Sequence, residues 1–149
     1  IDAFLDTIRS TFPSAFIRTA FIIGFPWETD EDFETLKNFV EKYQFESVGI
    51  FQYHDEPLAA SSKLADKVGD AVAKDRINTL NSLLEKIYEQ KKNTRKWVPQ
   101  IGYIMEIDGK TAIIRPELHA PEVDEYDEVL TENITGTRDI WSKVTYSLQ

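Results

Sequence analysis

The stretch Phe16-Ile-Arg-Thr-Ala-Phe-Ile-Ile-Gly-Phe-Pro-Trp-Glu-Thr29 decides how the first part of the chain folds, and the predicted strand is its run from Phe16 to Phe25. Its β-branched and aromatic residues predict a strand buried on both faces, as in parallel sheets. Pro26 ends that strand. Thr29 predicts a helix N-cap, because the carboxylates of Asp30, Glu31 and Asp32 suit the positive end of a helix dipole. We therefore expect a strand, a tight turn and a helix in succession.

A second strand is predicted from Ser47 to Tyr53, after that helix. Strand, helix and strand within about forty residues form a βαβ unit with parallel strands. Ligands of such units bind at the carboxyl ends of the strands, which here are Gly24 to Trp27 and Tyr53 to Glu56. Upstream, Ile1 to Phe12 has a helical apolar rhythm.

A long helix is predicted from about Asp70 to Lys96, where apolar residues keep the spacing of one buried face. Beyond it, Gly102 to Arg115 predicts a hairpin, with Asp108-Gly109 as its turn. Further strand patterns follow around Val129 to Thr135 and from Ile140 to Leu148. Short strands without helices indicate a small antiparallel barrel.

The change of pattern predicts two domains, residues 1–97 and residues 98–149. We expect Trp97 and Trp141 to pack the barrel and its junction with the long helix.

Composition excludes several classes of protein. Hydrophobic residues make up 42% of 149 residues, which suits packed domains and not a disordered chain. No apolar run is long enough to span a bilayer and no secretory leader opens the chain, so we expect a cytoplasmic protein without a membrane partner. The absence of cysteine excludes disulfides and thiolate-bound zinc or iron–sulfur clusters within these residues. His54 and His119 stand far apart, and we predict no metal ligands.

The net charge of −9 is unevenly placed. Residues 1–97 carry 13 Lys and Arg against 16 Asp and Glu, whereas residues 98–149 carry 4 against 10. An acidic barrel repels phosphate backbones and favours a basic protein partner. An ordinary solvated acidic surface is the alternative.

Two motifs carry a resemblance to a family. Gly24-Phe-Pro-Trp-Glu-Thr29 resembles the Gly-Phe-Pro-Gly-Glu-Thr segment of radical-SAM methylthiotransferases, with Trp27 in place of the usual glycine. From spacing alone it would be an ordinary strand-to-helix turn. His119-Ala-Pro-Glu-Val-Asp124 resembles a segment typical of the members that modify a ribosomal protein. The resemblance covers nearly the whole chain from about Ile17.

The resemblance implies an α/β remnant of a partial (β/α) radical-SAM barrel, followed by a small antiparallel TRAM-like β-barrel. The whole enzyme would use S-adenosylmethionine and two 4Fe-4S clusters to methylthiolate the β-carbon of an aspartate in a basic small-subunit ribosomal protein. An unactivated carbon needs radical chemistry, which cofactors supply and ordinary side chains do not. This piece holds no cluster cysteines, so we expect it to bind no cofactor alone, to contain no catalytic residue and to be inactive.

The resemblance also suggests site residues. Arg18, Gly24, Phe51 and Tyr53 are predicted to line the S-adenosylmethionine site. Arg18 could pair with the cofactor's carboxylate or form a strand-end salt bridge. The barrel residues predicted to bind the substrate protein are Glu122, Asp124, Glu125 and Asp127.

Two departures and two rival functions stay open. Between Asp124 and Asp127 the family normally has a glycine, a strand and a loop, so either this barrel is short or the sequence lacks residues; we expect the second. The chain opens at Ile1 partway through the barrel, and we expect the cluster-binding parts upstream. The remaining sheet is therefore expected to leave one edge and one face uncovered, which would make the fragment sticky or oligomeric. The rivals are part of a tRNA methylthiotransferase, which the acidic barrel disfavours, and a non-catalytic binding module for a basic protein.

Overall fold

The computed structural model describes residues 1–121 and 124–148. They form two compact units, Ile1–Glu89 and Gln90–Gln149. The division falls within a long helix, earlier than the change of sequence pattern at residues 97–98. The domain ranges 1–97 and 98–149 therefore stay a prediction.

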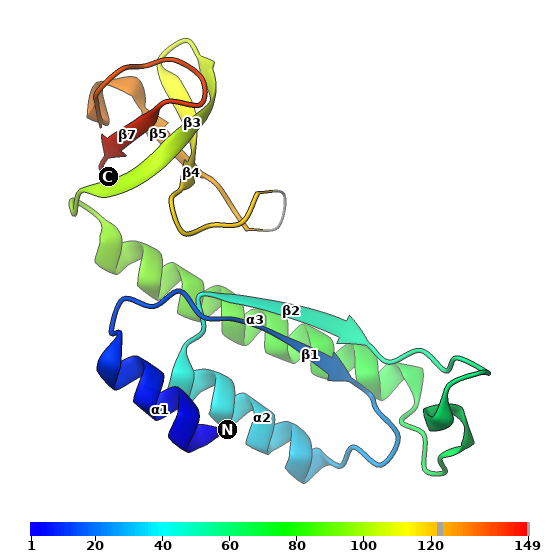
Figure 1. Cartoon of the computed structure of the whole chain (residues 1–149). Helices are drawn as coiled ribbons and strands as arrows, with labels where there is room; N and C mark the ends of the chain where they lie inside the picture. The colour runs from blue at the N-terminus through cyan, green and yellow to red at the C-terminus, as the bar shows by residue number, and fades with distance from the viewer. Residues whose placement is uncertain (122–123, 149) are drawn as a thin grey trace. The chain divides into compact units, whose positions relative to one another are not determined.

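The first unit contains a βαβ unit, as predicted (Figure 1). Strands β1 (Arg18–Ile23) and β2 (Ser47–Gln52) are parallel, in register from Arg18 opposite Ser47 to Ile23 opposite Gln52. The helices are α1 (Asp2–Thr11), α2 (Asp30–Tyr43) and α3 (Asp70–Arg95), and a short 3₁₀ helix, η1 (Ala60–Lys63), precedes α3.

Helix α2 begins where the sequence predicts it because Thr29 and Asp32 form a capping box. The backbone N–H of Asp32 donates to Thr29 Oγ1 at 3.1 Å, and the backbone N–H of Thr29 donates to Asp32 Oδ2 at 2.9 Å. Two N–H groups that would otherwise lack partners are thereby satisfied.

All three helices pack on one face of the two-stranded sheet. Phe21, Val48 and Ile50 contact the buried clusters that contain residues of α1, α2 and α3. On the opposite face, the paired residues Ile22 and Phe51 are 58% and 59% exposed. The first strand is not buried on both faces in this chain, and the expectation that the remaining sheet leaves one face uncovered is confirmed.

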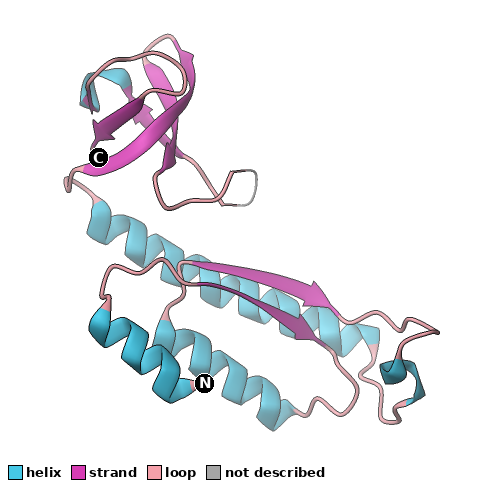
Figure 2. Cartoon of the chain, viewed as in Figure 1, coloured by secondary structure: helices cyan, strands magenta, loops and turns pink. Residues whose placement is uncertain are grey.

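The second unit carries a curled, five-stranded antiparallel sheet (Figure 2). Its strands are β3 (Gln100–Asp108), β4 (Thr111–Pro116), β5 (Asp127–Leu130), β6 (Ile134–Thr135) and β7 (Lys143–Tyr146), in the order β5-β4-β3-β7-β6. The antiparallel sheet confirms the all-β prediction for this part. The stretch predicted as one strand around Val129–Thr135 is broken by the 3₁₀ helix η2 (Thr131–Asn133).

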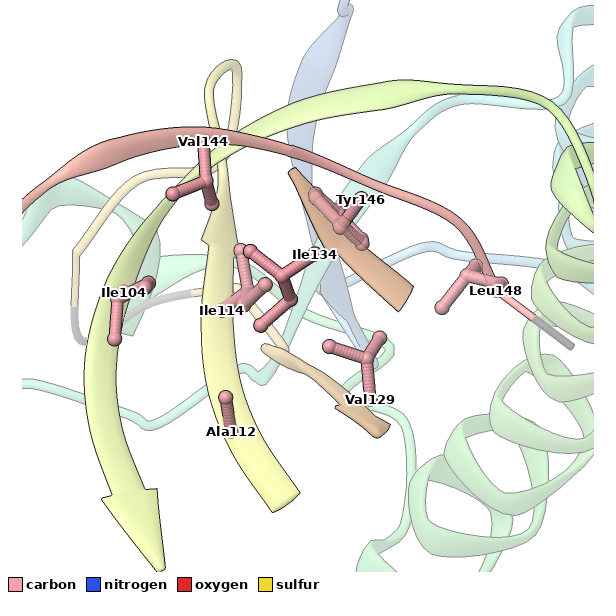
Figure 3. Close-up of a cluster of buried hydrophobic side chains, with 8 residues drawn as sticks. All are labelled: Ile104, Ala112, Ile114, Val129, Ile134, Val144, Tyr146 and Leu148. Atoms are coloured by element: carbon pink, nitrogen blue, oxygen red, sulfur yellow. The ribbon is translucent and has the colours of Figure 1, made fainter. Parts of the chain in front are cut away.

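The curled sheet encloses one buried apolar cluster, drawn in Figure 3. It consists of Ile104, Ala112, Ile114, Val129, Ile134, Val144, Tyr146 and Leu148. Gly102 belongs to its wall: an added Cβ would lie 2.5 Å from Ile114 Cγ2 and 2.7 Å from the carbonyl oxygen of Arg115. The strand therefore tolerates only glycine there.

The tryptophans of this unit do not pack its core. Trp97 and Trp141 are 71% and 67% exposed, with φ of 63° and 69°. The prediction that they pack the barrel and its helix junction is wrong. The core is already filled by the smaller aliphatic side chains and Tyr146, and the backbone at both tryptophans turns them outward.

Candidate functional site

The turn after β1 is organised around Gly24. Its φ of +84° lies in the region that glycine enters most easily. An added Cβ would sit 2.9 Å from Cβ of Ala73 on α3. The close approach that requires glycine is therefore to α3, a reason different from the ligand contact that the motif suggests.

The Glu28 carboxylate links the backbone of this turn to α3 through two hydrogen bonds. Its Oε2 accepts the backbone N–H of Gly24 at 3.0 Å, and its Oε1 accepts Nη1 of Arg76 at 2.6 Å. Nη1 of Arg76 also donates to the backbone oxygen of Glu28, and its Nη2 donates to Asp30 Oδ1 at 2.6 Å. The two side chains of the central pair are only 7% (Arg76) and 13% (Glu28) exposed.

The same contacts fix the charge state of Arg76. Burial alone would lower the pKa of its guanidinium, but the hydrogen bonds to Asp30 and Glu28 raise that pKa above its usual value. A permanent, buried cation therefore links the start of α2 to α3.

Sequence reasoning did not single out Arg76 or Glu28 as a pair. The available signal was the position of Arg76 on the buried face of α3, three residues after Ala73 and four before Leu80. A cation on an apolar helix face requires a carboxylate partner. The acidic residues of the preceding turn, Glu28 and Asp30, were the natural candidates.

The three predicted cofactor residues Gly24, Phe51 and Tyr53 lie near the carboxyl ends of β1 and β2. The backbone N–H of Tyr53 donates to the oxygen of Ile23 at 2.8 Å, and its ring packs edge-on against Phe25 at 5.2 Å between centroids. Phe51 lies on the open face beside Ile22.

Arg18 stands apart from these three. It is the first residue of β1, five residues and about 16 Å from the end of the strand at the usual rise. Its guanidinium carbon lies 5.3 Å from the ring centroid of Phe16. The structure therefore brings Gly24, Phe51 and Tyr53 together and leaves Arg18 at the opposite end of the sheet.

The four predicted substrate-binding residues of the barrel differ from one another in their surroundings. Asp127 is buried, 5% exposed, and its Oδ2 accepts the Tyr146 hydroxyl at 2.6 Å. Burial and this hydrogen bond raise the pKa of Tyr146 well above its usual value. Asp124 Oδ2 accepts the backbone N–H of Ala120 at 2.7 Å, and Glu125 is exposed. Glu122 lies outside the described residues.

Other carboxylates line the outer surface of the sheet. Glu106 on β3 pairs with Ile113 on β4, which pairs with Glu128 on β5. In the next row, Asp108 pairs with Thr111, and Thr111 with Leu130. Neighbouring strands lie about 4.8 Å apart, so Glu106 and Glu128 flank Ile113 at about 10 Å from each other. We call Glu106, Asp108, Ile113, Glu128 and Leu130 the acidic face.

Within residues 1–121 and 124–148, no group of three or more histidine, aspartate or glutamate side chains is placed to hold a metal ion. In the same residues, no helix combines the length and the apolar character needed to cross a membrane.

Comparison with known proteins assigns the family. No protein-family model matches the chain. Curated relatives do match, each named ribosomal protein uS12 methylthiotransferase RimO. The protein of Thermotoga sp. (strain RQ2) is 41% identical over 121 residues, which cover 80% of this chain and 28% of the relative. Those of Colwellia psychrerythraea (37% over 116 residues) and Aromatoleum aromaticum (41% over 118 residues) match 78% of this chain and 26% of their own length. The chain belongs to the RimO family.

The chain thus spans little more than a quarter of its RimO relatives, and the matched segment is their C-terminal part. The family context also explains the unusual residue in the turn. Trp27 has a φ of 73°, and its backbone N–H donates to the oxygen of Asp66 at 3.0 Å. Left-handed backbone favours glycine, which is the residue at this position of the Gly-Phe-Pro-Gly-Glu-Thr segment that this turn resembles.

Proposed function

We propose that the chain is the C-terminal part of an enzyme that methylthiolates the β-carbon of an aspartate in ribosomal protein uS12 by S-adenosylmethionine radical chemistry. The observation that carries this proposal is the 41% identity, over 80% of the chain, to a protein named as a uS12 methylthiotransferase.

The βαβ unit supports a place in a larger barrel. In (β/α) barrels the helices cover the outside of the strands, and the other face of each strand looks inward. Here all helices cover one face, and Ile22 and Phe51 project from the other. We therefore assign the open face of β1 and β2 to the barrel interior, as the remnant of a radical-SAM domain.

The residues at the carboxyl ends of the strands suit S-adenosylmethionine. Phe51 and Ile22 offer exposed apolar surface on which an adenine ring can pack. Tyr53, half-buried and packed against Phe25, adds a second aromatic side chain at the same edge. When reductively cleaved, the cofactor supplies the radical that abstracts hydrogen. In this arrangement Arg18 does not contact the reacting end, because it lies at the far end of β1.

The iron–sulfur clusters find no ligands in this chain. It contains no cysteine, so it supplies no thiolate to a cluster. The cluster-binding residues would belong to other parts of the polypeptide. Alone, this chain would bind the substrate protein without catalysing its modification, in the cytoplasm where ribosomal proteins are found.

We assign substrate binding to the TRAM-like barrel and its acidic face. Glu106 and Glu128 are exposed on either side of Ile113. Two carboxylates around an apolar residue suit a lysine- or arginine-rich segment, whose aliphatic stems cover Ile113 while its charges reach the carboxylates. Asp127 is left out of this surface because its carboxylate is buried against Tyr146.

One observation favours the rival tRNA function. On the same sheet Arg115 lies 5.0 Å from the ring of Tyr103, and Lys143 pairs with Tyr103 on the opposite side. An aromatic ring flanked by cations is a surface on which bases stack. Lys143 is, however, paired with Glu117. The cations at the end of α3 leave residues 90–149 with 8 Lys and Arg against 10 Asp and Glu, a net charge of −2. This charge repels tRNA less than the charge of residues 98–149 alone does.

Titration separates the two functions. The chain is titrated with purified uS12 and with tRNA at two salt concentrations. We expect salt-sensitive binding of uS12, weakened by the double variant Glu106→Gln/Glu128→Gln and unchanged by the charge-matched control Glu85→Gln/Glu89→Gln on α3. Tight, salt-sensitive tRNA binding that is lost in Tyr103→Ala would overturn the substrate assignment.

A further inference from the structure

The second unit contains a cavity whose lysines the proposed function does not use, although Glu128 and Leu130 belong both to its lining and to the acidic face. It has a volume of about 230 Å³ and lies between the end of α3 and the strand β5. Its polar lining includes Lys92, Lys96, Asn133 and Ser147, and its apolar lining includes Val129 and Leu148. All of these residues belong to the unit Gln90–Gln149.

The walls of the cavity are held by specific contacts. The backbone N–H of Trp97 donates to the oxygen of Leu148 at 2.9 Å, and Lys96 forms a bridge with Leu148. Nη2 of Arg95 lies 3.7 Å from Oδ1 of the buried Asp127. These contacts fix the end of the helix against the barrel.

The charges of the cavity favour an anion. Lys92 lies in the last turn of α3, Lys96 directly follows the helix, and both residues line the cavity. The negative pole of the helix lies at this end. The two lysines that line the cavity, Lys92 and Lys96, place full positive charges against the partial negative charge of this pole. Glu128 also lines the cavity and competes for the lysines.

The remaining lining selects the kind of anion. Val129, Leu130 and Leu148 form an apolar wall, and Asn133 and Ser147 add hydrogen-bonding groups. A volume below the usual range of about 300–1,000 Å³ for drug-sized ligands suits a single residue-sized molecule. The occupant should combine one carboxylate with a short aliphatic side chain.

We propose that this cavity binds an aliphatic carboxylate, with the carboxylate between Lys92 and Lys96 and the aliphatic part against Val129 and Leu148. Such a group can come from a small free acid or from the C-terminal residue of a peptide. In the second case the peptide's backbone can also pair with β5, which is an edge strand of the described sheet.

The test uses the full chain and three probes: N-acetyl-leucine, its uncharged amide N-acetyl-leucinamide, and a hexapeptide ending in leucine with a free carboxylate. Binding is followed by NMR through the backbone amides of Val129, Asn133, Ser147 and Leu148. We expect the acid to shift these amides and the leucinamide to leave them unchanged. Tighter binding of the peptide would identify a peptide terminus as the source, and equal binding a small acid.

Single substitutions around the cavity should change the affinity for N-acetyl-leucine in predictable directions. Lys92→Gln and Lys96→Gln should each weaken binding of N-acetyl-leucine about threefold, as expected for exposed ion pairs. Glu128→Gln should tighten it, because it removes a competing carboxylate. Lys91→Gln carries the same charge change outside the cavity and should have little effect. The proposal fails if leucinamide binds as well as the acid, or if Lys91→Gln weakens binding as much as Lys96→Gln.

Discussion

The largely buried pair of Glu28 and Arg76 should be a sensitive point of the first unit. Arg76→Met keeps an unbranched side chain over Phe33, so the packing of α3 is largely retained. It removes the only described cation hydrogen-bonded to the buried Glu28 carboxylate. The substitution therefore isolates the loss of the charge partner.

The expected loss in the free energy of unfolding follows from the low exposure of the Arg76 and Glu28 side chains. Removing one partner of a buried ion pair costs about 3–5 kcal/mol. Asp30 adds little, because its side chain is 97% exposed and exposed pairs contribute at most about 1 kcal/mol. Glu28 retains the N–H of Gly24, which places the expected loss at the lower limit, about 3 kcal/mol.

The assay is urea unfolding followed by tryptophan fluorescence in a Trp97→Phe/Trp141→Phe background, where Trp27 reports the first unit alone. With a urea dependence of about 1–1.5 kcal/mol per M, the midpoint should fall by about 2 M or more. The exposed Lys74→Met on the same helix serves as the control and should change stability by less than about 0.5 kcal/mol. In Glu28→Gln/Arg76→Met no charge is left buried, and the double variant should be more stable than Arg76→Met. If Arg76→Met unfolds at the same midpoint as Lys74→Met, the ion pair of Glu28 and Arg76 does not stabilise the first unit.

Three further predictions concern backbone geometry and pH. Trp27→Gly should be more stable than Trp27→Ala by about 1 kcal/mol in urea unfolding, because both lose the indole but only glycine relieves the left-handed φ; equal stabilities would show that the backbone there is unstrained. Gly102→Ala should lower the stability measured by thermal unfolding by about 2 kcal/mol or more, because the added Cβ has no room. Gly69→Ala, where an added Cβ meets nothing within 4 Å, should be close to neutral. A neutral Gly102→Ala would contradict the packing of the barrel wall. The hydrogen bonds from the Thr29 backbone and side chain lower the pKa of Asp32 below its ordinary value of 3.8. The stabilising effect of the Asp32 carboxylate is therefore fully present above pH 3.8 and is lost as the pH falls through the lowered pKa. Asp32→Asn should therefore unfold with a weaker pH dependence below about pH 4 than the parent chain, and an unchanged acid profile would contradict this.

The local elements could be predicted from the sequence because their signals are local. Thr29 and Asp32 carry the N-cap of α2, and the spacing of β1 and β2 around one helix predicts their parallel pairing. The hairpin was also predicted, although its two loop residues are Gly109 and Lys110, one position later than expected. Glycine with φ of +58° at the first loop position agrees with the turns that hairpins favour.

The tertiary features could not be predicted in the same way. An apolar run such as Phe21 to Ile23 has the same composition whether one or both faces are covered, and only the number of neighbouring strands decides between them. Trp97 and Trp141 look like core residues by size, but their outward position depends on a positive φ that no local pattern signals. Asp127 looks like one more carboxylate of an acidic run, and its burial depends on Tyr146, nineteen residues away.

Transplanting this chain into an active relative tests the proposed function most directly. The matching segment of the Thermotoga RimO protein is replaced by this chain, and uS12 is analysed by mass spectrometry after reaction with S-adenosylmethionine. We predict that uS12 gains one methylthio group on an aspartate and that Glu106→Gln/Glu128→Gln in the chimera reduces this modification. A chimera that folds and binds its iron–sulfur clusters but leaves uS12 unmodified would contradict the assignment.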